Sequence, residues 1–221
     1  MLQGPEQSKL FSNIYRTGQD VWTQIPYEDL AASLLPKMSD QLFLDIGSGR
    51  GKWVYQLLEN GHRVIGIDIV PELVTELNDD LEYRQAEHFA KFMNLDIFSS
   101  PFTQSSFDCV TDLLTFHHLP PRMWRAYVRE VADLLPRNGL YLNVVLSRAT
   151  PNFMGMRPSD TRYAHGLFAK HGLSYYFFTA EEIRNIFSSD FTIVAQHSAS
   201  FNPPTDPADE IVLIFTLLRR R

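Results

Sequence analysis

QLFLDIGSGRGKW, residues 41–53, is the stretch that decides the fold. It begins with an apolar run typical of a buried strand in a parallel sheet, made by Leu42, Phe43, Leu44 and Ile46. Glycines follow at alternate positions, Gly47, Gly49 and Gly51, and then a helix-like run over 52–58. Glycine is needed where a chain turns sharply and lets a ligand approach the bare backbone. Together these features predict a nucleotide-sized crevice at the carboxyl edge of a sheet.

Two acidic residues flank this turn and indicate which nucleotide it binds. Asp68 ends the next apolar run, roughly 20 residues further on, where a carboxylate can accept hydrogen bonds from ribose hydroxyls. Asp45 precedes the first glycine by two residues, where it would repel a pyrophosphate but suits a ligand that carries an ammonium and a sulfonium. The dinucleotide fingerprint also fails, because its third glycine comes one residue early and Lys52 occupies the place of a small residue.

The pattern D-x-G-x-G-x-G from Asp45, followed by Asp68, resembles the first two motifs of the class I S-adenosylmethionine-dependent methyltransferases. The alternative is an ordinary strand-to-helix turn. The resemblance extends motif by motif over residues 41–146 and implies S-adenosylmethionine as cofactor and S-adenosylhomocysteine as its product. It implies cofactor contacts from Asp45, Gly47, Ser48, Gly49, Gly51, Asp68 and Ile69.

A third strand is predicted over 92–95, and it ends in Asp96 and Ile97. In the family, an acidic residue at this place accepts a hydrogen bond from the adenine amino group, and an apolar neighbour packs on the ring. The alternative is that Asp96 only forms a turn, as aspartate often does at the end of a strand.

The sequence FDCVTDLL, residues 107–114, predicts a fourth strand and is followed by Thr115-Phe116-His117-His118. It resembles the fourth motif of the family, in which Asp112 would hold the polar position beside the methyl group. DNA amino-methyltransferases carry a different sequence there, so DNA is disfavoured as a substrate. His117 is a candidate general base, and the alternative is that the two histidines only pack and orient the loop. No metal site is expected, because adjacent residues rarely close one without distant partners.

Residues 1–40 are too apolar for a disordered tail and are predicted to form a helical segment that packs on the domain. In many small methyltransferases such a segment folds over the cofactor as a lid. The candidates for this role are Tyr15, Arg16 and Trp22, and aromatic packing alone is the alternative for each.

Residues 147–178 form a long connection rich in basic and aromatic residues. Connections of this length inside a compact domain are usually functional, and this one is expected over the crevice as a substrate cap. Arg157 or Arg162 would pair with a carboxylate or phosphate of the acceptor, and His165 belongs to the same candidate pocket. The alternative is a local cap with solvated arginines.

The alternation of strands and helices predicts one doubly wound α/β domain over residues 41–221. The two β runs over 191–199 and 211–218 should form a closing antiparallel hairpin. The family topology implies a seven-stranded sheet in the order 3-2-1-4-5-7-6 with the last strand antiparallel.

The composition indicates the cellular compartment and the class of binding partner. The formal net charge of −6 disfavours a nucleic-acid partner, since the only basic run of the sequence is the terminal Arg219 to Arg221. No signal-peptide pattern is visible, no apolar run approaches the ~20 residues of a membrane helix, and the single cysteine fits a reducing cytosol. We therefore expect a cytoplasmic enzyme without a membrane partner, of open oligomeric state.

The function predicted is S-adenosylmethionine-dependent methyl transfer to a small-molecule acceptor, on oxygen, nitrogen or sulfur. Three alternatives stay open at this point: a protein or RNA methyltransferase, a nicotinamide oxidoreductase of the same architecture, and a non-catalytic protein that retains the cofactor site.

Overall fold

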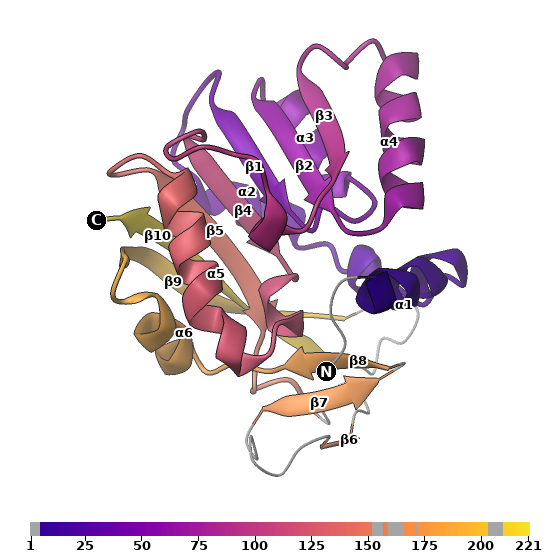
Figure 1. Ribbon diagram of the computed structural model, residues 1–221. Helices are drawn as coiled ribbons and strands as arrows, with labels where there is room; N and C mark the ends of the chain where they lie inside the picture. Colours follow the sequence, from indigo (N-terminus) through magenta and orange to yellow (C-terminus); the bar gives the residue numbers. More distant parts are fainter. Residues whose placement is uncertain (1–4, 152–156, 159–165, 171, 203–209) are drawn as a thin grey trace.

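The computed structural model describes residues 5–151, 157–158, 166–170, 172–202 and 210–221. Its centre is a seven-stranded, mostly parallel sheet in the order β3-β2-β1-β4-β5-β10-β9 (Figure 1). The strands are β1 (Leu42–Ile46), β2 (Arg63–Asp68), β3 (Ala90–Asn94), β4 (Cys109–Leu113), β5 (Leu140–Leu146), β9 (Phe191–Phe201) and β10 (Ile211–Arg220). Strand β10 runs antiparallel between β5 and β9, so the predicted closing hairpin is confirmed.

The predicted strand numbering 3-2-1-4-5-7-6 is not exact, because the chain forms three further strands before the closing hairpin. These are β6 (Arg157–Pro158), β7 (Leu167–Lys170) and β8 (Leu173–Tyr176), which make a separate antiparallel sheet in the order β6-β7-β8. Hydrophobic periodicity does not reveal these strands, since each is short and all lie within the connection over residues 147–178.

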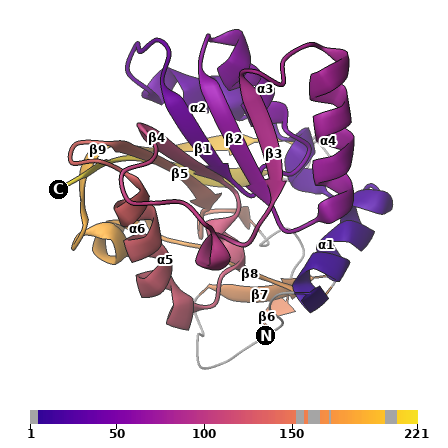
Figure 2. The ribbon, with the colours of Figure 1, turned by 45° about the horizontal axis from the view of Figure 1, so that its top comes forward.

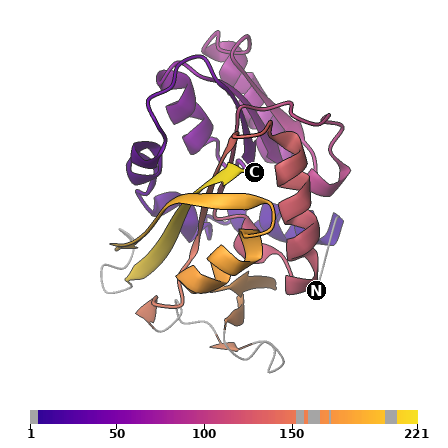
Figure 3. The ribbon, with the colours of Figure 1, turned by 90° about the vertical axis from the view of Figure 1, so that its left-hand side faces the viewer.

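Helices cover both faces of the main sheet. They are α1 (Pro5–Arg16), α2 (Glu28–Leu34), α3 (Lys52–Glu59), α4 (Pro71–Tyr83), α5 (Pro121–Leu134) and α6 (Ala180–Phe187), with short 3-10 helices η1 (Val21–Gln24), η2 (Ile97–Ser99) and η3 (Phe116–His118). Most buried apolar side chains of α2, α3 and α4 belong to one core cluster, and those of α5 and α6 belong to a second. Figure 3 shows the helices of the N-terminal half and α5 on opposite sides of the sheet.

Local sequence signals account for the start of several helices. Pro71 and Pro121 occupy the first helical positions of α4 and α5, where a missing backbone N–H costs nothing. A capping box opens α6: the Thr179 hydroxyl accepts from the Glu182 backbone N–H, and the Glu182 carboxylate accepts from the Thr179 backbone N–H.

The strand register brings the functional residues to one edge. Asp45 on β1 is level with Thr111 on β4 and with Gly66 on β2, so the carboxyl ends of these central strands finish close together. Helix α1 and the small sheet lie beyond this edge (Figures 1 and 2). No helix in the described ranges is long and apolar enough to cross a membrane.

Gly51 serves the packing of the helices. It precedes α3 with φ of +73°, and a Cβ there would lie 2.9 Å from a methyl carbon of Leu77 and 2.9 Å from the Phe92 ring. Both neighbours are buried in the first core cluster. A side chain at this position would therefore push α4 and β3 away from the start of α3.

We predict that Gly51→Ala destabilises the fold more than Gly61→Ala, which is the matched control. Gly61 also has positive φ, of +79°, but nothing lies within 4 Å of its added Cβ. Both changes should cost about 1–2 kcal/mol of backbone strain, and Gly51→Ala roughly 1–3 kcal/mol more for overpacking. Urea unfolding measures both, and equal losses would contradict this role of Gly51.

Candidate functional site

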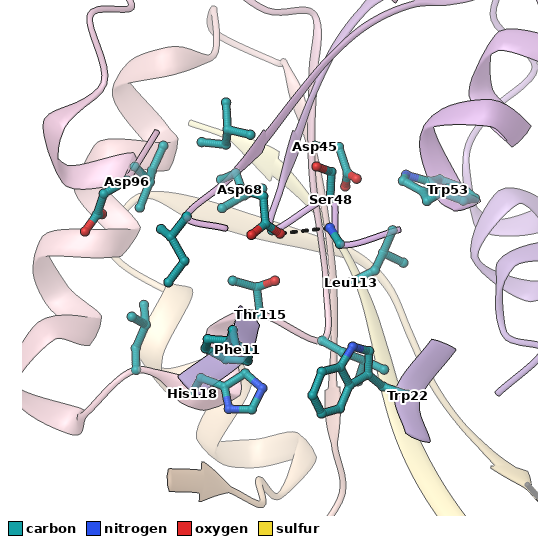
Figure 4. A pocket seen from close by; sticks show the side chains of 18 of the residues that line it. Phe11, Trp22, Asp45, Ser48, Trp53, Asp68, Asp96, Leu113, Thr115 and His118 are labelled. Carbon is teal, nitrogen blue, oxygen red and sulfur yellow. Dashed lines mark hydrogen bonds between the residues drawn. The ribbon is translucent and has the colours of Figure 1, made fainter. Parts of the chain in front are cut away.

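A cavity of about 290 Å³ lies at the carboxyl edge of the sheet, between the ends of the central strands and the N-terminal segment. Ten of the residues expected at a cofactor site line it: Tyr15, Trp22, Asp45, Gly47, Ser48, Gly49, Asp68, Ile69, Asp96 and Ile97. Figure 4 shows Asp45, Ser48, Asp68 and Asp96 on one side of the space and Phe11, Trp22 and His118 on the other.

The glycine turn forms the floor of this cavity. The backbone N–H groups of Gly47 and Ser48 both donate to the Ile67 carbonyl, at 2.8 and 3.0 Å, which ties the turn to the end of β2. A Cβ on Gly47 would lie 2.0 Å from the Thr115 hydroxyl oxygen, and one on Gly49 would lie 2.8 Å from the Tyr15 hydroxyl. The turn therefore presents bare backbone to the cavity because its neighbours leave no room for side chains.

Asp68 is buried at the end of β2 and is held by backbone donors. Its carboxylate accepts from the N–H of Gly49, the dashed line in Figure 4, and from that of Val70, each at 2.9 Å. Burial raises the pKa of Asp68, and the backbone hydrogen bonds oppose this rise. Each carboxylate oxygen keeps further acceptor capacity toward the cavity.

Asp45 is only 3% exposed and lies beside the turn on β1. Its carboxylate accepts from the Thr111 hydroxyl at 2.8 Å, and that hydroxyl accepts from the indole N–H of Trp53 at 3.1 Å. Burial, assisted by the nearby carboxylates of Asp112 and Asp68, raises the pKa of Asp45 to about 7. The described surroundings provide no cation to this carboxylate, so a cationic ligand would stabilise its charge.

Asp96 and Ile97 lie at the start of η2. One carboxylate oxygen of Asp96 accepts from the Phe98 backbone N–H at 3.0 Å, so the side chain caps the 3-10 turn. Both residues also line the cavity. The two interpretations of Asp96 from the sequence are therefore compatible.

The N-terminal segment is attached to the glycine turn by charged contacts that the sequence did not indicate. The Arg50 guanidinium binds the Asp20 carboxylate through two nitrogens, at 2.6 and 3.1 Å, and donates to the Tyr15 carbonyl at 2.9 Å. Lys52 pairs with Glu28 at 2.8 Å. Both pairs join residues at least 24 apart in the sequence, so no local pattern could predict them. Arg16, expected in the lid, is exposed, bonds to Asn13 at 2.7 Å and does not line the cavity.

Asp112 supports the turn after β4 and does not line the cavity. It is 0% exposed, and its carboxylate accepts from the Tyr127 hydroxyl and from the backbone N–H groups of Thr115 and Phe116, at 2.9 and 3.0 Å. Gly51 is likewise absent from the lining, because its position is set by α3 packing. The motifs predict that both residues lie near the cofactor site, but they do not show whether each residue faces the cavity.

Of the two adjacent histidines, His118 and not the predicted His117 faces the cavity. His117, the candidate base, is 2% exposed, stacks with Tyr175 and does not line the cavity, and burial lowers its pKa well below the usual range. His118 lines the cavity instead, with its Nδ1 at 3.0 Å from the Ser174 carbonyl of β8. The η3 turn decides which ring faces inward, and the sequence carries no signal for that choice.

The acceptor residues predicted from the connection cannot be placed. Arg162 and His165 lie outside the described residues, and Arg157 is described only as part of β6. Within the described ranges, no group of three or more His, Cys, Asp or Glu side chains could hold a metal ion.

Known proteins share both sequence and fold with this chain. Residues 43–139 match a family model described as a methyltransferase domain. A 27-O-demethylrifamycin SV methyltransferase of Amycolatopsis mediterranei (strain S699) is 31% identical over 112 residues, which is 50% of this chain and 40% of that relative's length. The match thus spans less than half of the relative.

Solved structures extend the likeness over the whole fold. A 1,6-didemethyltoxoflavin-N1-methyltransferase of Burkholderia thailandensis, solved with 1,6-didemethyltoxoflavin and S-adenosylhomocysteine, is similar over 100% of this chain and 92% of its own, at 22% identity and a TM-score of 0.73. The [4+2]-cyclase SpnF is similar over 87% of this chain and 80% of its own, at 16% identity and a TM-score of 0.68. Likeness at these identities shows the fold alone.

The matching domain and the mostly parallel seven-stranded sheet agree with the motifs around Asp45 and Asp68. Residues 43–139 therefore match a methyltransferase domain, and the sheet that contains them has the fold of the class I, S-adenosylmethionine-dependent enzymes.

Proposed function

We propose that this chain binds S-adenosylmethionine in the cavity described above and transfers its methyl group to a small-molecule acceptor. One observation carries the proposal: two buried carboxylates, of Asp45 and Asp68, flank a turn of bare glycine backbone. Such a pair suits a cationic, ribose-bearing ligand and opposes a pyrophosphate. For this reason a nicotinamide dinucleotide is disfavoured.

The lining residues fit each part of the cofactor. Asp45 would hold the ammonium and Asp68 the ribose hydroxyls, while Asp96 and Ile97 would hold the adenine. The backbone over 47–49 would lie along the methionine portion.

The cofactor, when bound, supplies a methyl group activated by its sulfonium. The chain itself has to bind, orient and exclude water, which is sufficient for a displacement that brings its own leaving group. The N-terminal segment contributes by covering the cavity with Phe11, Tyr15 and Trp22. We also propose that residues 1–40 form a lid over the cofactor and that residues 147–178 form a cap over the substrate.

A small-molecule acceptor is supported by the cavity and by the relatives. Residues of α1 and η1 line the cavity together with the sheet edge, and the formal net charge of −6 disfavours nucleic acid. The rifamycin and toxoflavin relatives are named for small acceptors. A protein or RNA acceptor is the alternative.

The cytoplasmic location and the absence of a DNA partner stay predictions.

A role other than methyl transfer, including a non-catalytic one, is the remaining alternative, because the fold alone does not fix the reaction. SpnF is described as a [4+2]-cyclase although its fold is the same. Detection of a methylated product in a screen of metabolite pools with labelled cofactor would decide for catalysis.

We predict that Asp45→Asn and Asp68→Ala each weaken the binding of S-adenosylhomocysteine by roughly 10- to 100-fold, since a hydrogen bond to a charged group contributes about 1.5–3 kcal/mol. Isothermal titration calorimetry measures this directly. The control is Asp79→Ala, an exposed acidic position on α4 away from the cavity, which should bind like the wild type. Equal affinity in all four proteins would reject the site.

The affinity for S-adenosylhomocysteine should also depend on pH through Asp45. Its raised pKa of about 7 means that the free protein binds a proton there below neutral pH, while a bound ammonium favours the carboxylate. Affinity should therefore rise about tenfold between pH 6 and pH 8. In Asp45→Asn this rise should disappear, and a wild-type profile that is flat over this range would contradict the assignment.

A further inference from the structure

The side of the cavity opposite the two carboxylates is aromatic, and it comes from three separate elements. Phe11 lies on α1, Trp22 on η1 and His118 on η3 (Figure 4). Their ring centroids lie 5.0 Å apart for Phe11 and His118, 6.2 Å for Phe11 and Trp22, and 6.0 Å for Trp22 and His118. We call these three residues the aromatic wall.

The rings of the aromatic wall meet at steep angles of 82°, 74° and 69°. In this edge-to-face arrangement the three rings do not stack on one another, so ring surface remains for a guest. Flat aromatic guests gain from both offset-stacked and edge-to-face contacts with such a wall.

The geometry of His118 fixes which ring nitrogen carries the proton. Nδ1 lies 3.0 Å from the Ser174 carbonyl oxygen, which can only accept, so Nδ1 donates and Nε2 presents a lone pair. The Tyr175 ring, 4.7 Å away, supports the imidazole from behind. Burial lowers the pKa of His118 to about 4, so the ring is neutral at physiological pH.

Nε2 of His118 is open to the cavity. No described residue forms a hydrogen bond to it, and it is not among the buried polar atoms that lack a partner. Because His118 lines the cavity, this lone pair is available to an O–H or N–H of a bound molecule.

The charges of the lining disfavour an anionic guest. Arg50 and Lys52 are the lining cations in the described part of the chain, and they are engaged by Asp20 and Glu28. The remaining lining carboxylates, of Asp45, Asp68 and Asp96, would repel a carboxylate or a phosphate.

We infer that the methyl acceptor of this site is an uncharged, planar aromatic molecule with an O–H or N–H on its ring, and that Nε2 of His118 accepts a hydrogen bond from that group. The inference rests on the proposed function, because it places the acceptor opposite the carboxylates that would hold the cofactor. His118 is then an acceptor-binding residue that selects the protonated heteroatom.

The test uses matched pairs of probes in which a methyl group replaces the donor hydrogen. One pair is 2-naphthol and 2-methoxynaphthalene, and the other is indole and 1-methylindole. Each probe is titrated by NMR into the protein after calorimetry has shown that the protein is saturated with S-adenosylhomocysteine. The wild type should bind the donor member of each pair about three- to tenfold more tightly, the effect of one neutral hydrogen bond. The anionic probe 2-naphthoate should bind more weakly than 2-naphthol.

His118→Phe keeps an aromatic ring and removes the lone pair, so it should bind both members of a pair equally. His117→Phe is the matched control: it changes the adjacent ring, which does not line the cavity, and should keep the preference. S-adenosylhomocysteine binding should be retained in both variants, which shows that each is folded.

Three results would overturn the inference while the cofactor site stands: equal binding of both members by the wild type, a preference that survives in His118→Phe, or no binding of any probe to the loaded protein. Failure of the wild type to bind S-adenosylhomocysteine would instead reject the proposed function, and the inference with it.

Discussion

The burial of two carboxylates beside a turn of bare backbone is the constraint on which the site depends. Removing a charge from water is costly unless hydrogen bonds replace the lost hydration. Asp68 obtains them from the N–H groups of Gly49 and Val70, and Asp45 from the Thr111 hydroxyl. The replacement is less complete for Asp45, whose pKa is raised to about 7. A cationic ligand would supply the remaining stabilisation of the Asp45 charge.

The two basic side chains at the glycine turn are paired with acidic residues, so they do not neutralise the buried carboxylates. Arg50 lies in the glycine turn, and Lys52, at the start of α3, occupies the position where the dinucleotide fingerprint has its third glycine. Here both side chains are neutralised by Asp20 and Glu28 of the N-terminal segment. The cavity therefore keeps a negative character, and the segment is fastened over the site by the same ion pairs. Ser8 adds a third attachment, because its hydroxyl donates to the Ile69 carbonyl at 2.6 Å.

The parts that could be predicted from the sequence were set by local pattern. The strand, glycine turn and helix around residues 41–58 follow from hydrophobic periodicity and from glycine, and Asp68 follows from its place at the end of the next strand. Pro71, Pro121 and the capping box at Thr179 marked helix starts for reasons of backbone chemistry. These features depend on neighbours within a few residues.

The rest depends on contacts between distant segments. The Arg50–Asp20 pair spans 30 residues, and the hydrogen bond from His118 to Ser174 spans 56. The choice of His118 over His117, the inward position of Phe11 and the structural role of Asp112 all follow from how the η3 turn, α1 and α5 pack. The small sheet β6–β8 was hidden because its strands are too short for periodicity to identify.

A crystal structure of the protein grown with S-adenosylhomocysteine would test the central claim most directly. We expect the ribose hydroxyls on the Asp68 carboxylate and the ammonium on the Asp45 side of the glycine turn, with the adenine beside Asp96 and Ile97. Density for the ligand elsewhere, or an adenosine whose ribose does not reach Asp68, would contradict the role assigned to the two buried carboxylates.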